Sequence, residues 1–111
     1  MGKKEKENIS LLREKINQLD SEIIKLLADR RKLSKEIILT KENSQRPIRD
    51  RQREVELLNR LSKIGKKEGL DSNFLTKVFN EIIKDSVKIQ QKHISEKLKV
   101  QSILNNKKDT N

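Results

Sequence analysis

The sequence predicts an all-α fold with three helices per chain, one long and two shorter, in an interlaced helical homodimer. The first observation is an apolar stripe at helical spacing in residues 9–42, which no Gly or Pro interrupts. The second is a pair of shorter stripes with the same spacing in residues 47–67 and 72–94. The third is the absence of any alternation of apolar and polar residues that would indicate a strand.

The first helix is expected to run from about Asn8 to Glu42, with either Asn8 or Ser10 as its N-cap residue. At about 3.6 residues per turn, its stripe consists of Leu12, Ile16, Leu19, Ile23, Leu26, Leu33 and Ile37. A helix of ~34 residues is ~50 Å long, far longer than the radius of a compact domain of this size. Because two shorter helices of the same chain cannot cover such a stripe, we expect a second copy of the chain to cover it.

The other two helices are expected at residues 47–67 and 72–93, with short connections before and between them. Pro47 suits the first position of a helix, because its missing N–H has no partner there. Gly69 suits the position after the end of the second helix. Asp71 is expected to cap the start of the third.

The chain of 111 residues is long enough for one domain, which we place at residues 9–94. We expect residues 1–8 to be a charged, disordered leader and residues 95–111 to be a tail that passes from partly helical to disordered. There is no cysteine, so neither disulfides nor thiolate chemistry is expected. No segment predicts a membrane span or a signal peptide, and a cytoplasmic protein is the default expectation.

The composition is strongly basic, with a net charge of +10, and it contains 40% charged and 32% hydrophobic residues. Residues 8–94 alone hold 20 basic and 13 acidic residues, so the positive charge is not confined to a tail. A basic protein attracts many kinds of anion. Charge by itself therefore leaves both a nucleic acid and a small acid open as partners.

Polar residues lie on the apolar stripe of every predicted helix, within about 40° of its centre for those in the first and third helices. They are Arg30, Lys41, Asp50, Arg53, Glu54, Ser86 and Gln90. Buried charges without partners are costly, and three inward cations are not balanced by two inward acids. The pattern predicts a cationic polar pocket inside a helical bundle, large enough for a small anion.

Several of these residues also have an ordinary structural interpretation. Arg30 could pair with a carboxylate in the core, and Asp50 could complement the dipole of its helix. Ser86 could donate to a carbonyl of its own helix. Arg13 lies at the edge of the first stripe, about 100° from its centre, where an ordinary solvated residue is the simpler interpretation.

The chain lacks the patterns of several other chemistries. It has no cluster of residues with metal-ligand spacing, no phosphate-binding glycine loop and no nucleophile beside a base. The inward residues are suited to binding carboxylates and hydroxyls. If the site is catalytic, we expect it to act by conformational restraint and electrostatics.

Three segments, in order and with matching spacing, resemble the all-helical chorismate mutases. They read LREKI at 12–16 with LLADRR at 26–31, RPIRD at 46–50 with RE at 53–54, and IIKDSV at 82–87 with QQ at 90–91. The similarity is greatest to the mutase domain of the enteric members that also carry a prephenate dehydratase. It implies an interlaced homodimer with two equivalent sites that converts chorismate to prephenate, in aromatic amino-acid biosynthesis, without a cofactor.

The resemblance also implies a role for each site residue. Arg30 and Arg13 would bind the two carboxylates of the substrate, with Arg13 contributed by the partner chain. Lys41 and Gln90 would donate to the ether oxygen. The remaining four residues would complete the substrate contacts: Glu54 would accept from the ring hydroxyl, with Asp50 nearby, and Arg53 and Ser86 would make further polar contacts.

Three alternatives remain open at this point. A lyase that releases pyruvate from isochorismate could use the same fold and similar residues. A basic helical protein that binds nucleic acid would fit the net charge, although the inward placement of the cations and the absence of a recognised binding motif count against it. A scaffold dimer whose inward charges merely pair would bind no ligand.

Overall fold

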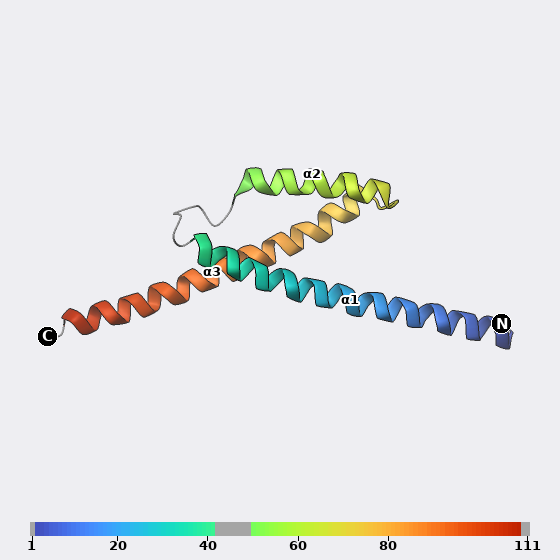
Figure 1. Ribbon diagram of the computed structural model, residues 1–111, viewed down its shortest axis with the longest axis horizontal. Helices are drawn as coiled ribbons and strands as arrows, with labels where there is room; N and C mark the ends of the chain where they lie inside the picture. Colours follow the sequence, from blue (N-terminus) through green and yellow to red (C-terminus); the bar gives the residue numbers. More distant parts are fainter. Residues whose placement is uncertain (1, 42–49, 110–111) are drawn as a thin grey trace. The chain divides into compact units, whose positions relative to one another are not determined.

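The computed structural model describes residues 2–41 and 50–109, with side chains in residues 2–40 and 50–107. The described residues form three helices and no strand, which confirms the all-α prediction (Figure 1). The helices are α1 (Lys3–Lys41), α2 (Arg51–Lys67) and α3 (Ser72–Asp109). No described helix has a stretch long and apolar enough to cross a membrane.

Two helices extend further than the sequence predicted. Residues 3–8, expected to be a disordered leader, belong to α1, and the expected tail after His93 continues α3 to Asp109. The third helix is therefore long, not short as predicted. Both segments lack Gly and Pro and are rich in Lys, a good helix former, so nothing in them ends a helix that is already formed.

The start of the second helix also differs from the prediction. α2 begins at Arg51, because Asp50 has an extended backbone with φ −108° and ψ 98°. The Asp50 side chain instead caps the helix by accepting a hydrogen bond from the N–H of Arg53 at 3.0 Å. Pro47 and the connection before it lie outside the described residues.

The chain divides into two compact units, residues 1–33 and 34–111. The second unit contains the end of α1 together with α2 and α3. Helices α2 and α3 pack side by side as a hairpin, and the second half of α3 continues past α2 (Figure 1). The most deeply buried apolar side chains of the described residues, Ile38 and Ile83, belong to this unit, with 2% and 6% of their surface exposed.

The turn between α2 and α3 is fixed by backbone hydrogen bonds. The N–H of Leu70 donates to the carbonyl of Gly65 at 2.8 Å, and the N–H of Gly69 donates to that of Lys66 at 3.2 Å. Gly69 has a φ of 75°, in the left-handed region. These features together are the Schellman motif, which satisfies the last carbonyls of a helix, and they confirm the predicted role of Gly69.

On the α3 side of this turn a side chain caps the helix, and on the α2 side a glycine allows close packing. The carboxylate of Asp71 accepts from the N–H of Phe74 at 3.2 Å, which confirms the predicted cap of α3. Gly65 is buried where α2 meets α3, and a Cβ added there would overlap the side chain of Leu75. The two helices therefore approach closely at this end of the hairpin.

The apolar stripe of α1 is uncovered in the single chain. Its residues in the first unit each expose more than half of their surface, from 54% to 65%, and they are Leu12, Ile16, Leu19, Ile23, Leu26 and Leu33. Isolated helices in water are only marginally stable, and most helical stability in proteins comes from packing of the apolar face. This unit therefore lacks the packing that such a stripe normally requires.

The left-handed conformation at Gly69 gives a direct test of the hairpin. We expect Gly69→Ala to lower the free energy of unfolding by about 1 kcal/mol, because an L side chain is strained at positive φ. Gly2→Ala is the matched control, since a Cβ added at Gly2 would contact nothing within 4 Å and Gly2 does not have a positive φ. Thermal and urea unfolding followed by circular dichroism would measure both, and equal stability of the two variants would contradict this account of the turn.

Candidate active site

One face of helix α3 points toward the interior of the second unit, and this face carries both apolar and polar residues. Ile83, Ser86 and Gln90 recur at helical spacing and share this face. Gln90 exposes only 7% of its surface, and Ser86 is half-buried. A glutamine amide carries two donors and an acceptor oxygen, so its burial places hydrogen-bonding groups in an otherwise apolar layer.

The end of α1 meets this face through a pair of serines. The hydroxyl of Ser34 donates to the hydroxyl oxygen of Ser86 at 3.3 Å, and Ser34 exposes only 7% of its surface. Ile38, one turn further along α1, is buried as well. The hydrogen bond joins two helices whose serines lie 52 positions apart in the sequence.

Ser34 was not among the residues singled out from the sequence. The signal was nevertheless present, because Ser34 lies about 40° from the centre of the first stripe, as near as Ser86 and Gln90 lie to theirs. A single serine on a long apolar stripe is easily taken for a tolerated small residue. Only the contact with α3 distinguishes it.

Ser86 also makes the bond that its ordinary structural interpretation predicted. Its hydroxyl donates to the carbonyl of Ile82, one turn earlier in α3, at 3.2 Å. The Ser86 O–H therefore donates within its own helix, while the Ser86 oxygen accepts from Ser34. The two hydrogen bonds together connect Ser34 through Ser86 to the backbone of α3.

The acidic and basic residues at the start of α2 have distinct environments. Glu54 is half-buried and engaged in a polar interaction, whereas Arg53 is exposed. Asp50 is also exposed and uses Oδ1 to cap α2. Asp50 thus acts as the N-cap of α2 and does not lie inside its first turn as expected, and Glu54 is the more enclosed of the two acids.

The remaining predicted residues belong to α1. Arg30 is half-buried with a polar partner, and Arg13 is exposed on a shallow groove along the helix, beside Glu14 and Asn17. Both arginines lie in the first unit. Lys41 is the last residue of α1, and its side chain lies outside the described residues.

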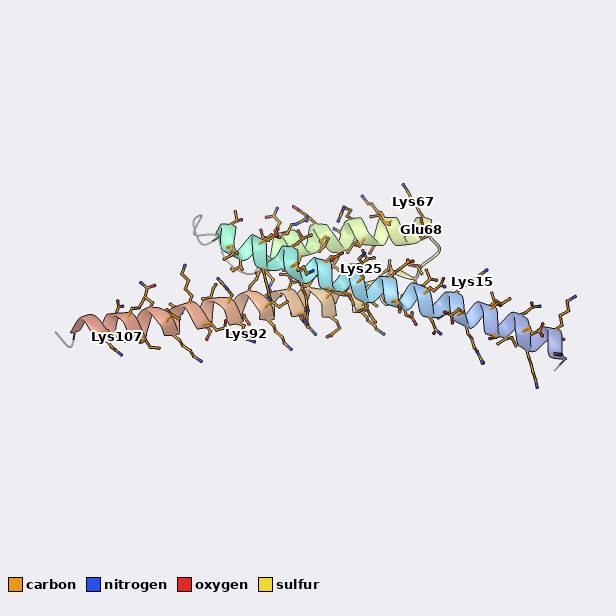
Figure 2. All side chains as sticks on the ribbon, turned by 60° about the horizontal axis from the view of Figure 1, so that its bottom comes forward. Lys15, Lys25, Lys67, Glu68, Lys92 and Lys107 are labelled. Atoms are coloured by element: carbon orange, nitrogen blue, oxygen red, sulfur yellow. The ribbon has the colours of Figure 1, made fainter. Side chains whose placement is uncertain are left out.

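Most of the positive charge is on the surface of both units. Figure 2 labels Lys15 and Lys25 on α1, and Lys92 and Lys107 on α3, and all four are exposed. Across residues 2–41 and 50–109, no three His, Cys, Asp or Glu side chains gather in a group that could hold a metal ion. The buried groups on the α3 face are neutral hydroxyl and amide groups, which can donate hydrogen bonds to an oxygen acceptor.

Comparison with known proteins matches most of this sequence to one family. The sequence model of the family described as chorismate mutase type II matches residues 12–91, which include α2 and most of α1. The bifunctional chorismate mutase/prephenate dehydratase of Escherichia coli (strain K12) is 49% identical over 80 residues, covering 72% of this chain and 21% of that protein. The protein of the same name from Buchnera aphidicola subsp. Schizaphis graminum is 41% identical over 87 residues, covering 78% of this chain and 23% of that protein.

A shorter relative covers nearly its whole length. The chorismate mutase of Methanocaldococcus jannaschii is 31% identical over 90 residues, which make up 81% of this chain and 91% of that protein. By contrast, the chain spans about a fifth of the length of the bifunctional relatives that it matches. With the family match extending over residues 12–91, this chain belongs to the chorismate mutase type II family.

Proposed function

We propose that this chain is a chorismate mutase, which rearranges chorismate to prephenate without a cofactor. The observation that carries the proposal is the buried Gln90 amide on the interior face of α3, one turn after Ser86, within the segment that matches the family. A buried neutral donor suits a reaction in which negative charge grows on an oxygen atom. We place this activity in residues 9–94.

The reaction is an intramolecular Claisen rearrangement, in which a C–C bond forms while the ether C–O bond breaks. The enolpyruvyl arm of chorismate must first fold over the ring. Arg30 and Arg13 would each hold one carboxylate and thereby restrict the arm to the reactive geometry, since bidentate Arg–carboxylate pairs fix orientation as well as position. Binding of two carboxylates also gives a role to the positive charge of the chain.

The second contribution is electrostatic. As the C–O bond breaks, the ether oxygen gains negative charge, and Lys41 and Gln90 would donate hydrogen bonds to it. Donors fixed in advance stabilise the transition state more than the substrate, which is the condition for a faster reaction. Because the bonds rearrange within one molecule, the reaction needs no nucleophile, acid or base.

The other site residues would complete the contacts around the substrate. Glu54, half-buried in α2, would accept a hydrogen bond from the ring hydroxyl, with Asp50 nearby. Ser86, on the same face of α3 as Gln90, and Arg53 would add polar contacts. In this arrangement each of the three helices contributes to one site.

The proposal includes an interlaced homodimer with two equivalent sites. The uncovered stripe of α1 supports it, because contiguous exposed apolar surface of this extent marks an interaction site. A second copy of the same helix offers a surface of matching length and character, and two-fold symmetry would bury both stripes together. The exposed position of Arg13 fits a residue that serves the site of the partner chain.

The test of the proposed function is the loss of chorismate, followed by absorbance, with purified protein and no added cofactor. Prephenate in the product would be identified by its acid conversion to phenylpyruvate. Turnover of isochorismate to pyruvate, with chorismate unchanged, would instead identify the lyase that shares this fold. A folded protein that consumes neither compound would refute both activities.

Replacing the charged donor should slow the reaction sharply. We expect Lys41→Ala to lower kcat on the order of 10²–10³-fold or more, as removal of a preorganised donor does. Lys35→Ala is the matched control, because Lys35 is exposed on α1 and about 140° from the centre of its stripe. Steady-state kinetics on both variants would check this, and near-normal kcat for Lys41→Ala would contradict the assigned role.

The amide of Gln90 predicts a specific pH dependence. The unmodified chain should change little in activity between mildly acidic and neutral pH, because an amide does not titrate in this range. Gln90→Glu should be active only while the new carboxyl keeps its proton, so its activity should fall as pH rises, by up to about tenfold per unit above its pKa. Parallel kcat/KM profiles for both proteins would test this, and a flat profile for the variant would argue against donation by residue 90.

Sharing of the site between chains can be tested by mixing two inactive variants. Arg13→Ala and Arg30→Ala should each have little activity alone. Unfolding and refolding them together should restore about a quarter of the sites, because one of the two sites in each mixed dimer then contains both arginines. Absence of any recovery in a sample shown by light scattering to be dimeric would mean that both arginines come from one chain.

A further inference from the structure

Ser34 is a buried polar residue that has no role in the proposed mechanism. It exposes 7% of its surface, the same fraction as Gln90, and its hydroxyl donates to Ser86 at 3.3 Å. Burial of a hydroxyl is unfavourable unless the group is hydrogen-bonded. The bond to Ser86 therefore compensates for the burial, and it ties the end of α1 to the site face of α3.

Other hydroxyls of the same helix behave differently. Ser21 and Thr40 donate to carbonyls four residues earlier in α1, at 3.1 and 3.0 Å, and both are exposed. This local bond is the common choice for a serine or threonine in a helix. Ser34 directs its hydroxyl across to another helix instead, so its bond constrains tertiary structure.

The hydrogen bond from Ser34 also determines the direction in which the Ser86 hydroxyl donates. A hydroxyl has one donor hydrogen and two acceptor lone pairs. With Ser34 donating to it, Ser86 has its hydrogen directed to the Ile82 carbonyl, and its oxygen is held in one orientation by bonds on two sides. Donation from Ser34 polarises the Ser86 hydroxyl and makes it a stronger donor, because linked hydrogen bonds reinforce one another.

The location of the bond connects it with the proposed donors. Gln90 lies one turn beyond Ser86 on α3, and Lys41 lies two turns beyond Ser34 at the end of α1. A fixed contact between Ser34 and Ser86 sets the register of one helix against the other at this level. The relative position of the segments that carry the two donors depends on that register.

We propose that Ser34 is a positioning residue of the active site: it acts through Ser86, orienting its hydroxyl and holding the end of α1 in register with α3. The inference rests on the proposed function, since its effect is measured on the mutase reaction. At 3.3 Å the bond is longer than the ~2.8 Å typical of hydroxyl pairs. Hydrogen bonds in ligand-free active sites are often long and shorten when the substrate binds.

The experiment is a double-mutant cycle on kcat and KM. Ser34→Ala should lower kcat by roughly 3–10-fold, the effect of one neutral hydrogen bond, with a smaller change in KM, because orientation matters most in the transition state. In a Ser86→Ala background the same substitution should change kcat by less than about twofold, since its target is already gone. Ser34→Thr, which keeps the hydroxyl, should recover most of the lost activity.

The matched control is Ser21→Ala, which removes an exposed hydroxyl of the same helix and should leave kcat unchanged. Thermal unfolding of every variant separates loss of activity from loss of the fold. Multiplicative effects of Ser34→Ala and Ser86→Ala, or failure of a folded Ser34→Thr to recover activity, would overturn the inference. Absence of chorismate turnover by the unmodified chain would instead refute the proposed function, so the two failures are distinguishable.

Discussion

The constraint on which the rest of the structure depends is the uncovered apolar stripe of α1. Within the first unit, the leucines and isoleucines of the stripe expose more than half of their surface. An isolated helix in water has only marginal stability. Covering the stripe would add stability to this chain, because apolar burial dominates folding energetics. In the proposed homodimer the contact that covers the stripe also brings Arg13 to the partner's site, so folding and catalysis would share one interface.

A second constraint is the presence of polar residues within thin apolar layers. Ser34 and Gln90 each expose 7% of their surface, close to the 6% of the buried Ile83, in a chain with only 32% hydrophobic residues. Such residues lower the stability that a purely apolar core would give, and natural sequences break this rule chiefly at functional sites. The serine pair shows how part of that unfavourable burial is compensated, since the Ser34 hydroxyl donates to Ser86 and the Ser86 hydroxyl donates to the Ile82 carbonyl.

The hairpin of α2 and α3 is defined by local interactions at its turn. The Schellman motif at Gly69, the cap at Asp71 and the close approach at Gly65 are all local devices, and together they set the angle at which the helices leave the turn. Glu54 on α2 and Gln90 on α3 are therefore carried on elements whose pairing is fixed by a few backbone bonds. Sites built on helices hold their geometry better than sites on loops.

The sequence by itself determined the helical class and the cap and turn residues of the hairpin, because these follow from periodicity and local backbone chemistry. It misplaced the outer ends of α1 and α3, where weak propensities decide, and the start of α2, where the side chain of Asp50 caps the helix from an extended backbone. Tertiary structure alone decided that Ser34 meets Ser86, since a contact across 52 positions depends on how helices pack and not on any local pattern.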